Sequence, residues 1–371
     1  MWHLNRNSHP YAMYDGIVAE PRAFVEVAGR TAAKLKELNL DFRDLSELLV
    51  IGAGSSLYAA QYAQYLSWEV RTKQPLRVMS SSDFVEFGPT PSDSTLGICI
   101  SHRGTERYTS RSVEKLVRLR RPCLYVVGQN ANLSHLSGGS FEILETTPQD
   151  QSPAHTWSYM GSMAVLCALL QELNPEHSLL SGSLLTDEIP AALDLMLASE
   201  NVMEALAQEC MKATKIWIVG AGADAVIARE VALKIVETSY IIAQGYELEE
   251  VIQGPLQGAN QDDVFILLNS AGRLSDRVSA ILEALDVLDL RLLVLSCGQD
   301  GPQAKPFAVT RKRQTSWVAI PNRLPYPYAS LEVLIPMQFF AYFLALACGR
   351  HPDSFRLDDD RFRLAREKLQ G

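Results

Sequence analysis

A short apolar strand, a glycine turn and a helix follow one another twice in this chain, and this repeat limits the fold more than any other feature. The first copy has Leu48-Leu49-Val50-Ile51 before the turn Gly52-Ala53-Gly54-Ser55-Ser56. The second has Ile216-Trp217-Ile218-Val219 before Gly220-Ala221-Gly222. Apolar residues at helical spacing follow each turn. The copies lie about 168 residues apart, so whole domains are repeated and the chain is not a solenoid.

Further apolar runs alternate with helical segments in both halves of the chain. The predicted strands lie at residues 48–51, 76–79, 96–100, 124–127 and 141–144, and then at 216–219, 264–268, 292–295 and 317–320. Strands that alternate with helices predict βαβ units and parallel sheets, which is an α/β fold. The stretch 174–190, which contains Pro, Ser and Gly, is predicted to be a linker.

The length of 371 residues exceeds one ordinary core and also predicts two domains. The predicted parts are an N-terminal segment with the first helix at 1–30, a first domain at 31–180, a linker and connecting helix at 181–212, a second domain at 213–350 and a C-terminal tail at 351–371. The most apolar stretch, 329–348, contains Glu332, Pro336 and Gln338, which favours a buried helix over a membrane span.

Composition excludes several classes of function. The net charge of -9 argues against nucleic-acid binding, because the basic runs are short. None of the six cysteines forms a CxxC pair, and the seven histidines show no metal-ligand spacing, so neither a disulfide framework nor a metal site is expected. The N-terminus lacks the pattern of a secretory signal. We therefore expect a cytoplasmic protein without nucleic-acid or membrane partners.

The glycine turns suit an anion better than a dinucleotide. Neither turn has the third glycine of a dinucleotide site, and Ser80-Ser81-Ser82 stands where a ribose-binding carboxylate is expected. A helix N-terminus with free N–H groups and serine hydroxyls suits a single phosphate. Gly54-Ser55-Ser56 and the loop 101–105 both follow strands, where open α/β sheets bind ligands. The alternative is that these Ser and Thr residues only cap helices.

The stretch 228–255 carries the strongest candidate for chemistry. Glu230, Lys234 and Glu237 lie at i, i+4 and i+7 of a predicted helix, so they project from one face. Two carboxylates and an ammonium suit proton transfer on a small molecule. The alternative is an ordinary solvated Glu–Lys face. The residues that follow are predicted to form an irregular loop ending in Gly254-Pro255.

Several ordered segments resemble the tandem SIS (sugar isomerase) domain family, which includes the isomerase half of glucosamine-6-phosphate synthase and stand-alone phosphosugar isomerases and deaminases. They are Met13–Pro21, Gly54–Ser56, Ser101–Glu106, Pro153–Tyr159, Glu230–Tyr240 and Gly254-Pro255. The resemblance covers about Met13 to Phe355. It implies two tandem domains, each a five-stranded parallel sheet flanked by helices in an αβα, flavodoxin-like sandwich. It also implies a homodimer with no cofactor.

The resemblance implies roles for particular residues. Ser55, Ser56, Ser101 and Thr109 would contact the phosphate of a sugar or amino sugar. Glu237 would be the base that moves a proton between C1 and C2, while Glu230 and Lys234 would position the sugar or tune Glu237. The other expected substrate-binding positions are Gly54, His102, Arg103, Thr105, Ala154, His155, Thr156 and Gln253.

Three departures from the family pattern predict a changed substrate. Gln253 stands where the family has a ring-opening histidine, and Gln is neither an acid nor a base at pH 7. In the phosphate loop Arg103 replaces Ser and Glu106 replaces Thr. The tail has no Lys at the family's position. His102 and His155 could replace the missing histidine, or could be loop residues satisfied by the backbone.

The sequence thus predicts a sugar-phosphate enzyme that acts by C1/C2 enolisation, as an aldose–ketose isomerase or an amino-sugar-phosphate deaminase or deglycase. Glutaminase activity is not expected, because no N-terminal cysteine follows Met1. The alternative is a non-catalytic sugar-phosphate sensor or regulatory protein. The sequence does not distinguish whether Arg103 would bind a phosphate or a carboxylate.

Overall fold

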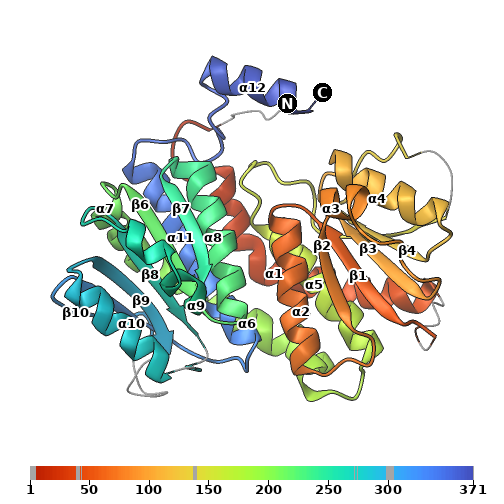
Figure 1. Ribbon diagram of the computed structural model, residues 1–371, viewed down its shortest axis with the longest axis horizontal. Coiled ribbons are helices and arrows are strands. Elements are labelled where there is room, and N and C mark those ends of the chain that lie inside the picture. The colour runs from red at the N-terminus through yellow and green to blue at the C-terminus, as the bar shows by residue number, and fades with distance from the viewer. Residues whose placement is uncertain are drawn as a thin grey trace. The chain divides into compact units, whose positions relative to one another are not determined.

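The structure is a computed structural model that describes residues 6–38, 42, 44–136, 140–270, 272–273, 275–297 and 305–370. The chain divides into two compact units. The N-terminal unit comprises Ala19–Asp150 and His155–Ala191, and the C-terminal unit comprises Met1–Val18, Gln151–Ala154 and Ala192–Gly371. Each unit is built around its own β-sheet (Figure 1).

The sheet of the N-terminal unit is wholly parallel, with the order β2-β1-β3-β4-β5. Its strands are β1 (Glu47–Gly52), β2 (Leu76–Ser80), β3 (Thr95–Ile100), β4 (Cys123–Val127) and β5 (Glu142–Glu145). This is the flavodoxin-like order, in which the ligand crevice lies outside the carboxyl ends of β1 and β3. The predicted five-stranded parallel sheet is confirmed.

Helices cover both faces of this sheet (Figure 1). They are α1 (Ala12–Leu38), α2 (Ser55–Glu69), α3 (Ser81–Glu86), α4 (Arg107–Arg118), α5 (Trp157–Leu173) and α6 (Ile189–Met196), of which α1 and α6 are shared with the C-terminal unit. Helix α2 packs on β1, β2 and α5. On the other face, Phe84 of α3 and Leu116 of α4 pack on Leu49 and Ile51.

The sheet of the C-terminal unit repeats this order with one addition. Its strands are β6 (Lys215–Gly220), β7 (Ile242–Glu247), β8 (Val264–Asn269), β9 (Arg291–Cys297), β10 (Val309–Lys312) and β11 (Thr315–Ile320). The sheet order is β10-β11-β9-β8-β6-β7, and the strands are parallel except β10, which runs antiparallel to β11. The second sheet therefore has the five expected parallel strands and a sixth, antiparallel one.

Two layers of helices flank this second sheet. They are α7 (Glu200–Cys210), α8 (Ala223–Ser239), α9 (Leu248–Ile252), α10 (Ser275–Val287) and α11 (Leu331–Ala347). A further helix, α12 (Asp360–Gln370), lies away from this sheet (Figure 1). Helices α7 and α8 both pack on α11, and α8 packs on β6 and β7. Residues from α9 and α10 pack with Trp217, Val219 and Phe265 in one apolar cluster on the other face.

Helix α11 confirms the predicted buried helix at 329–348. The segment Tyr328–Ala347 is long and apolar enough to cross a membrane, but 94% of its apolar window is buried inside the structure. The carboxylate of Glu332, fully buried in α11, accepts hydrogen bonds from the backbone N–H groups of Arg323 and Leu324. A buried carboxylate satisfied by the protein's own backbone is typical of a core helix.

Two predicted loops are more regular than the sequence indicated. The stretch 174–190 was predicted to be a linker but forms a 3-10 turn at Ser178–Leu180 and a π-helix at Leu184–Glu188. Leu180, Leu184 and Leu185 are buried, and this apolar anchoring explains the helical turns. Likewise, the residues after α8 are not one irregular loop, because they contain β7 and α9.

Candidate functional site

The glycine turn Gly52–Ser56 sets the start of α2 at the carboxyl end of β1. Gly54 has φ of +55° and precedes the helix, a backbone conformation that other residues rarely adopt. A Cβ on Gly52 would lie 2.9 Å from the backbone carbon of Ser56, so only glycine lets the helix begin this close to the strand. Gly54 is exposed, while Ser55 and Ser56 form the first helical turn and are half-buried.

The second loop, after β3, is dominated by Glu106. Its side chain caps α4 by accepting hydrogen bonds from the N–H groups of Tyr108 (3.2 Å) and Thr109 (2.6 Å). The Thr109 hydroxyl donates to the same carboxylate at 2.5 Å. Thr109 is fully buried, so both of its donors, which were expected to serve a phosphate, are engaged by Glu106.

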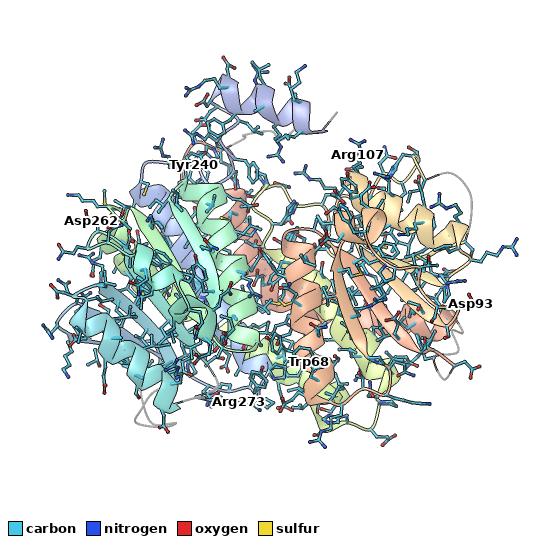
Figure 2. The ribbon with its side chains drawn as sticks, viewed as in Figure 1. Trp68, Asp93, Arg107, Tyr240, Asp262 and Arg273 are labelled. Carbon is cyan, nitrogen blue, oxygen red and sulfur yellow. The ribbon has the colours of Figure 1, made fainter. Side chains whose placement is uncertain are left out.

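Other predicted positions in this loop differ in exposure. Ser101 and His102 are buried directly after β3, while Arg103 is half-buried and Thr105 is exposed. Arg107, which begins α4, is exposed at the surface of the unit (Figure 2). The loop therefore presents the Arg103 guanidinium and the Glu106 carboxylate at the two positions where the sequence departs from the family pattern.

His102 is locked in one orientation by hydrogen bonds. The N–H of Asp150 donates to His102 Nε2 at 3.1 Å, so Nδ1 carries the proton and faces Thr146 Oγ1 at 3.1 Å. The Thr146 hydroxyl in turn donates to the carbonyl of Val127 at 3.2 Å. Burial lowers the pKa of His102 to about 4, against the opposing effect of Asp150 and with the help of His155 and Arg103. At neutral pH this imidazole is uncharged.

His155 forms a pair with the buried carboxylate of Asp150. Its Nδ1 lies 2.7 Å from Asp150 Oδ2 and 3.3 Å from Ser158 Oγ. Because a carboxylate only accepts, Nδ1 donates and Nε2 is left as the acid–base atom of the ring. The Asp150 side chain is 4% exposed and that of His155 23% exposed. A buried aspartate that orients a more accessible histidine is an arrangement suited to general acid–base chemistry.

The side chains of His102, Asp150 and His155 could together reach one cation. Among the residues that the structure describes, they are the group of candidate metal ligands that lies close enough to do so. The candidate ligand atoms of His102, Asp150 and His155 lie within 4.8 Å of one another. The lone pair of His102 Nε2 already accepts the Asp150 N–H, and His155 already donates to Asp150. Hydrogen bonds thus account for this cluster without an ion.

Helix α8 brings the three predicted catalytic residues of the C-terminal unit together. Lys234 Nζ lies 2.7 Å from Glu237 Oε2 and 3.5 Å from Glu230 Oε1. The exposed fractions of the side chains are 0% for Glu230, 1% for Lys234 and 14% for Glu237. This is not a solvated face, because α8 packs against α11 and Thr238 contacts the carbonyl of Ala341. Of the two carboxylates, Glu237 is the one that solvent reaches.

The C-terminal helix α12 adds a cation that sequence reasoning missed. The Arg366 guanidinium lies 4.3 Å from the centre of the Phe355 ring. Burial lowers the pKa of Arg366, and the charge of Glu237 opposes this shift. Arg366 Nη1 is buried and has no hydrogen-bond partner among the described residues. The family-like tail segment carries no lysine, and nothing in the sequence indicated that an arginine further on would take a place near Glu237.

The remaining predicted positions fall into two groups. Thr156 is buried before α5, and Ala154 is fully buried. Gln253 is exposed at the end of α9 in the C-terminal unit. By unit, Gly54, Ser55, Ser56, Ser101, His102, Arg103, Thr105, Thr109, His155 and Thr156 lie in the N-terminal unit, and Ala154, Glu230, Lys234, Glu237 and Gln253 lie in the C-terminal unit.

Side chains of the protein occupy the space around the second glycine turn, Gly220–Gly222. Asp224, in the first turn of α8, accepts hydrogen bonds from the Ser270 N–H at 2.9 Å and the Ser270 hydroxyl at 2.7 Å. Burial raises the pKa of Asp224, against hydrogen bonds from Ser270 and Ser330. The Tyr326 hydroxyl lies 2.5 Å from where a Cβ on Gly222 would stand. The duplicated turn therefore does not provide a second anion site of the same kind.

The two sheets and their strand order define an α/β protein with two doubly wound, mostly parallel sheets. A sequence model of the SIS domain matches residues 210–335, so this part of the chain is similar to a SIS domain. The match covers the second of the two predicted domains and confirms the resemblance seen in the sequence.

Relatives extend the similarity over nearly the whole chain. A glutamine–fructose-6-phosphate aminotransferase (isomerizing) of Aquifex aeolicus is 24% identical over 93% of this chain and 56% of its own length. The chain thus spans about half the length of this curated relative. The C-terminal domain of a glucosamine-fructose-6-phosphate aminotransferase from Francisella tularensis superimposes with a TM-score of 0.77 at 17% identity, covering 94% of this chain and 99% of that one.

A third relative shares the fold at similar coverage. The tagatose-6-phosphate ketose/aldose isomerase of Escherichia coli superimposes with a TM-score of 0.76 at 16% identity, over 96% of this chain and 98% of that one. At such identities the likeness establishes the fold and leaves the reaction to be argued from the residues of this chain.

Proposed function

We propose that this chain is an enzyme that moves a proton between C1 and C2 of an open-chain sugar or amino sugar. The carboxylate of Glu237 removes the proton from one carbon and returns it to the other, so the step has no net proton change. An aldose and a ketose interconvert in this way. An amino sugar passes through an enolamine, which becomes an imine when the proton returns to C1, and water then hydrolyses the imine to a ketone and ammonia or an amine. The phosphorylated sugars named for two relatives make a phosphate ester the first substrate class to test.

The arrangement around Lys234 carries this proposal. A buried ammonium between two carboxylates offsets part of the cost of removing these carboxylates from water. Glu237 combines this support with access to solvent, as a base for a small molecule requires. Glu230, which is fully buried, holds Lys234 in place instead of touching the substrate.

We further propose that His155 takes the ring-opening role left by Gln253. The pair with Asp150 supports this, because it orients the imidazole and leaves Nε2 to exchange a proton. Asp150→Asn should slow the turnover of a cyclic substrate about tenfold or more. The turnover of an analogue that lacks the ring-closing hydroxyl should stay unchanged. The exposed Asp187→Asn is the control. Equal losses on both substrates would contradict the role.

The central experiment measures turnover directly. The protein is incubated with amino-sugar and ketose phosphates and with the corresponding unphosphorylated sugars, while ammonia release and aldose–ketose interconversion are followed. At least one compound should turn over, and Glu237→Gln should lower that rate by about a hundredfold or more. The exposed Glu249→Gln on α9 is the matched control and should retain the wild-type rate.

A second candidate function is a non-catalytic sugar-phosphate sensor or regulatory protein. The absence of an acid–base group at Gln253 favours it. If no compound turns over while several raise the melting temperature, binding without chemistry is the function. We also propose, from the resemblance alone, a cytoplasmic homodimer that needs no cofactor; light scattering of the purified protein tests the dimer.

A further inference from the structure

We propose that Glu106 sets the substrate specificity of the N-terminal unit by supplying the negative charge that a substrate phosphate would otherwise bring. The crevice should then receive a neutral or cationic part of the substrate, a sugar hydroxyl or an ammonium, and discriminate against a phosphate monoester. This inference rests on the proposed function in one respect, which is that the ligand is a sugar derivative. It concerns binding and not the proton-transfer step.

Glu106 lies beside the loop that follows β2. Strand β1 lies between β2 and β3 in the sheet. The Ser81 hydroxyl, which follows β2, lies 3.5 Å from Glu106 Oε2, and Glu106 itself follows β3. A contact between these two loops spans the carboxyl end of β1, where the Gly54 turn begins. The carboxylate therefore stands in the crevice at which the strand order reverses, the ligand-binding place of this architecture.

Glu106 already engages hydrogen-bond donors at the start of α4. The N–H groups of Tyr108 and Thr109 and the hydroxyl of Thr109 all point at the Glu106 carboxylate. The two N–H groups belong to the second and third residues of a helix of 12 residues, and such amides bind an anion at a helix N-terminus. With Glu106 in place, an incoming phosphate finds these donors satisfied.

The charge of Glu106 also disfavours a phosphate in this crevice. A phosphate monoester carries close to two negative charges at neutral pH, and a fixed carboxylate in the same crevice repels it. The carboxylate instead favours hydroxyl and ammonium groups, because its remaining lone pairs can accept hydrogen bonds from them. Ser81 and Thr109 are buried around it, so water screens this charge less than it would a surface carboxylate.

Equilibrium binding of inorganic phosphate tests the inference without requiring a known substrate. Glu106→Thr removes the charge and leaves a hydroxyl that caps a helix. This variant should bind inorganic phosphate at least about tenfold more tightly than the wild type, followed by phosphorus NMR and by the shift in melting temperature. The gain should shrink at high salt. Glu106→Asp, which keeps both the charge and the capping ability, should stay near the wild-type affinity.

Glu106→Gln guards against a folding defect, because its amide oxygen still caps α4 while the charge is gone. Circular dichroism of all three variants checks the fold. If Glu106→Thr and Glu106→Gln gain no phosphate affinity, an arginine already neutralises the carboxylate and the inference is wrong. These outcomes do not depend on turnover, so loss of the proposed enzyme activity and loss of this inference are separate results.

Discussion

Lys234 Nζ stands 2.7 Å from Glu237 Oε2 on the buried side of α8, with Glu230 Oε1 at 3.5 Å on the other side. The ammonium faces two carboxylates inside a packed helix interface. The three residues form one electrostatic unit, in which each charge makes burial of the others tolerable. This relationship turns an ordinary i, i+4 spacing into a candidate site of proton transfer.

Removing the central charge should be costly. Lys234→Met leaves two carboxylates without their ammonium, and we expect it to lower the free energy of unfolding by about 3–5 kcal/mol, measured by urea denaturation. Lys34→Met is the matched control, because Lys34 also pairs with a Glu three residues later but both partners are exposed. The control should change stability by less than about 1 kcal/mol. A similar small effect at Lys234 would show that the cluster is not electrostatically coupled.

The pH dependence of stability should reveal His102. Its pKa is lowered in the folded protein from 6.5 to about 4, so the unfolded chain binds the additional proton first as pH falls. Stability should therefore decrease from about pH 6.5 towards pH 4, by on the order of 3 kcal/mol. His102→Gln should flatten this part of the profile relative to the exposed His135→Gln. An unchanged slope in His102→Gln would refute the assignment.

The parts of the fold predicted from the sequence are those whose burial leaves an apolar signature. Strands β1, β3 and β4 are almost wholly buried and stand out as apolar runs. Strand β7, at an edge of its sheet, alternates exposed and partly buried residues, and β10 is exposed throughout. Such edge strands are held largely by main-chain hydrogen bonds to one neighbour, so their side chains carry no comparable pattern.

The same contrast holds for the candidate site. The alignment of Glu230, Lys234 and Glu237 follows from helical geometry alone and is confirmed by their distances. The partner of His155 is Asp150. The distance between His155 Nδ1 and Asp150 Oδ2 depends on how the loop after β5 folds. The cap formed by Glu106 likewise depends on where α4 begins. Relations set by loop conformation have no fixed spacing in the sequence.

Metal chelation separates hydrogen bonding from coordination at His102, Asp150 and His155. Because hydrogen bonds already engage the facing atoms of the cluster, we expect chelator treatment to leave the melting temperature and turnover unchanged. One equivalent of Zn²⁺ should likewise leave the melting temperature unchanged. Stoichiometric binding of Zn²⁺ that is abolished by His155→Gln would instead identify a metal site.

A structural and a functional role of Arg366 predict opposite results for the melting temperature and kcat/KM of Arg366→Met. An unpaired buried donor costs folding free energy, so Arg366→Met, which keeps an apolar side chain beside Phe355, should leave the melting temperature equal or higher. If the free donor and its charge serve the substrate handled by Glu237, the same variant should lower kcat/KM by about tenfold or more. Arg363→Met on the same helix, where Arg363 already pairs with Asp360 and Glu367, should leave kcat/KM unchanged. If Arg366→Met is destabilised but keeps a normal kcat/KM, the role of Arg366 is structural. A cation that only holds α12 in place stabilises the fold and does not affect turnover.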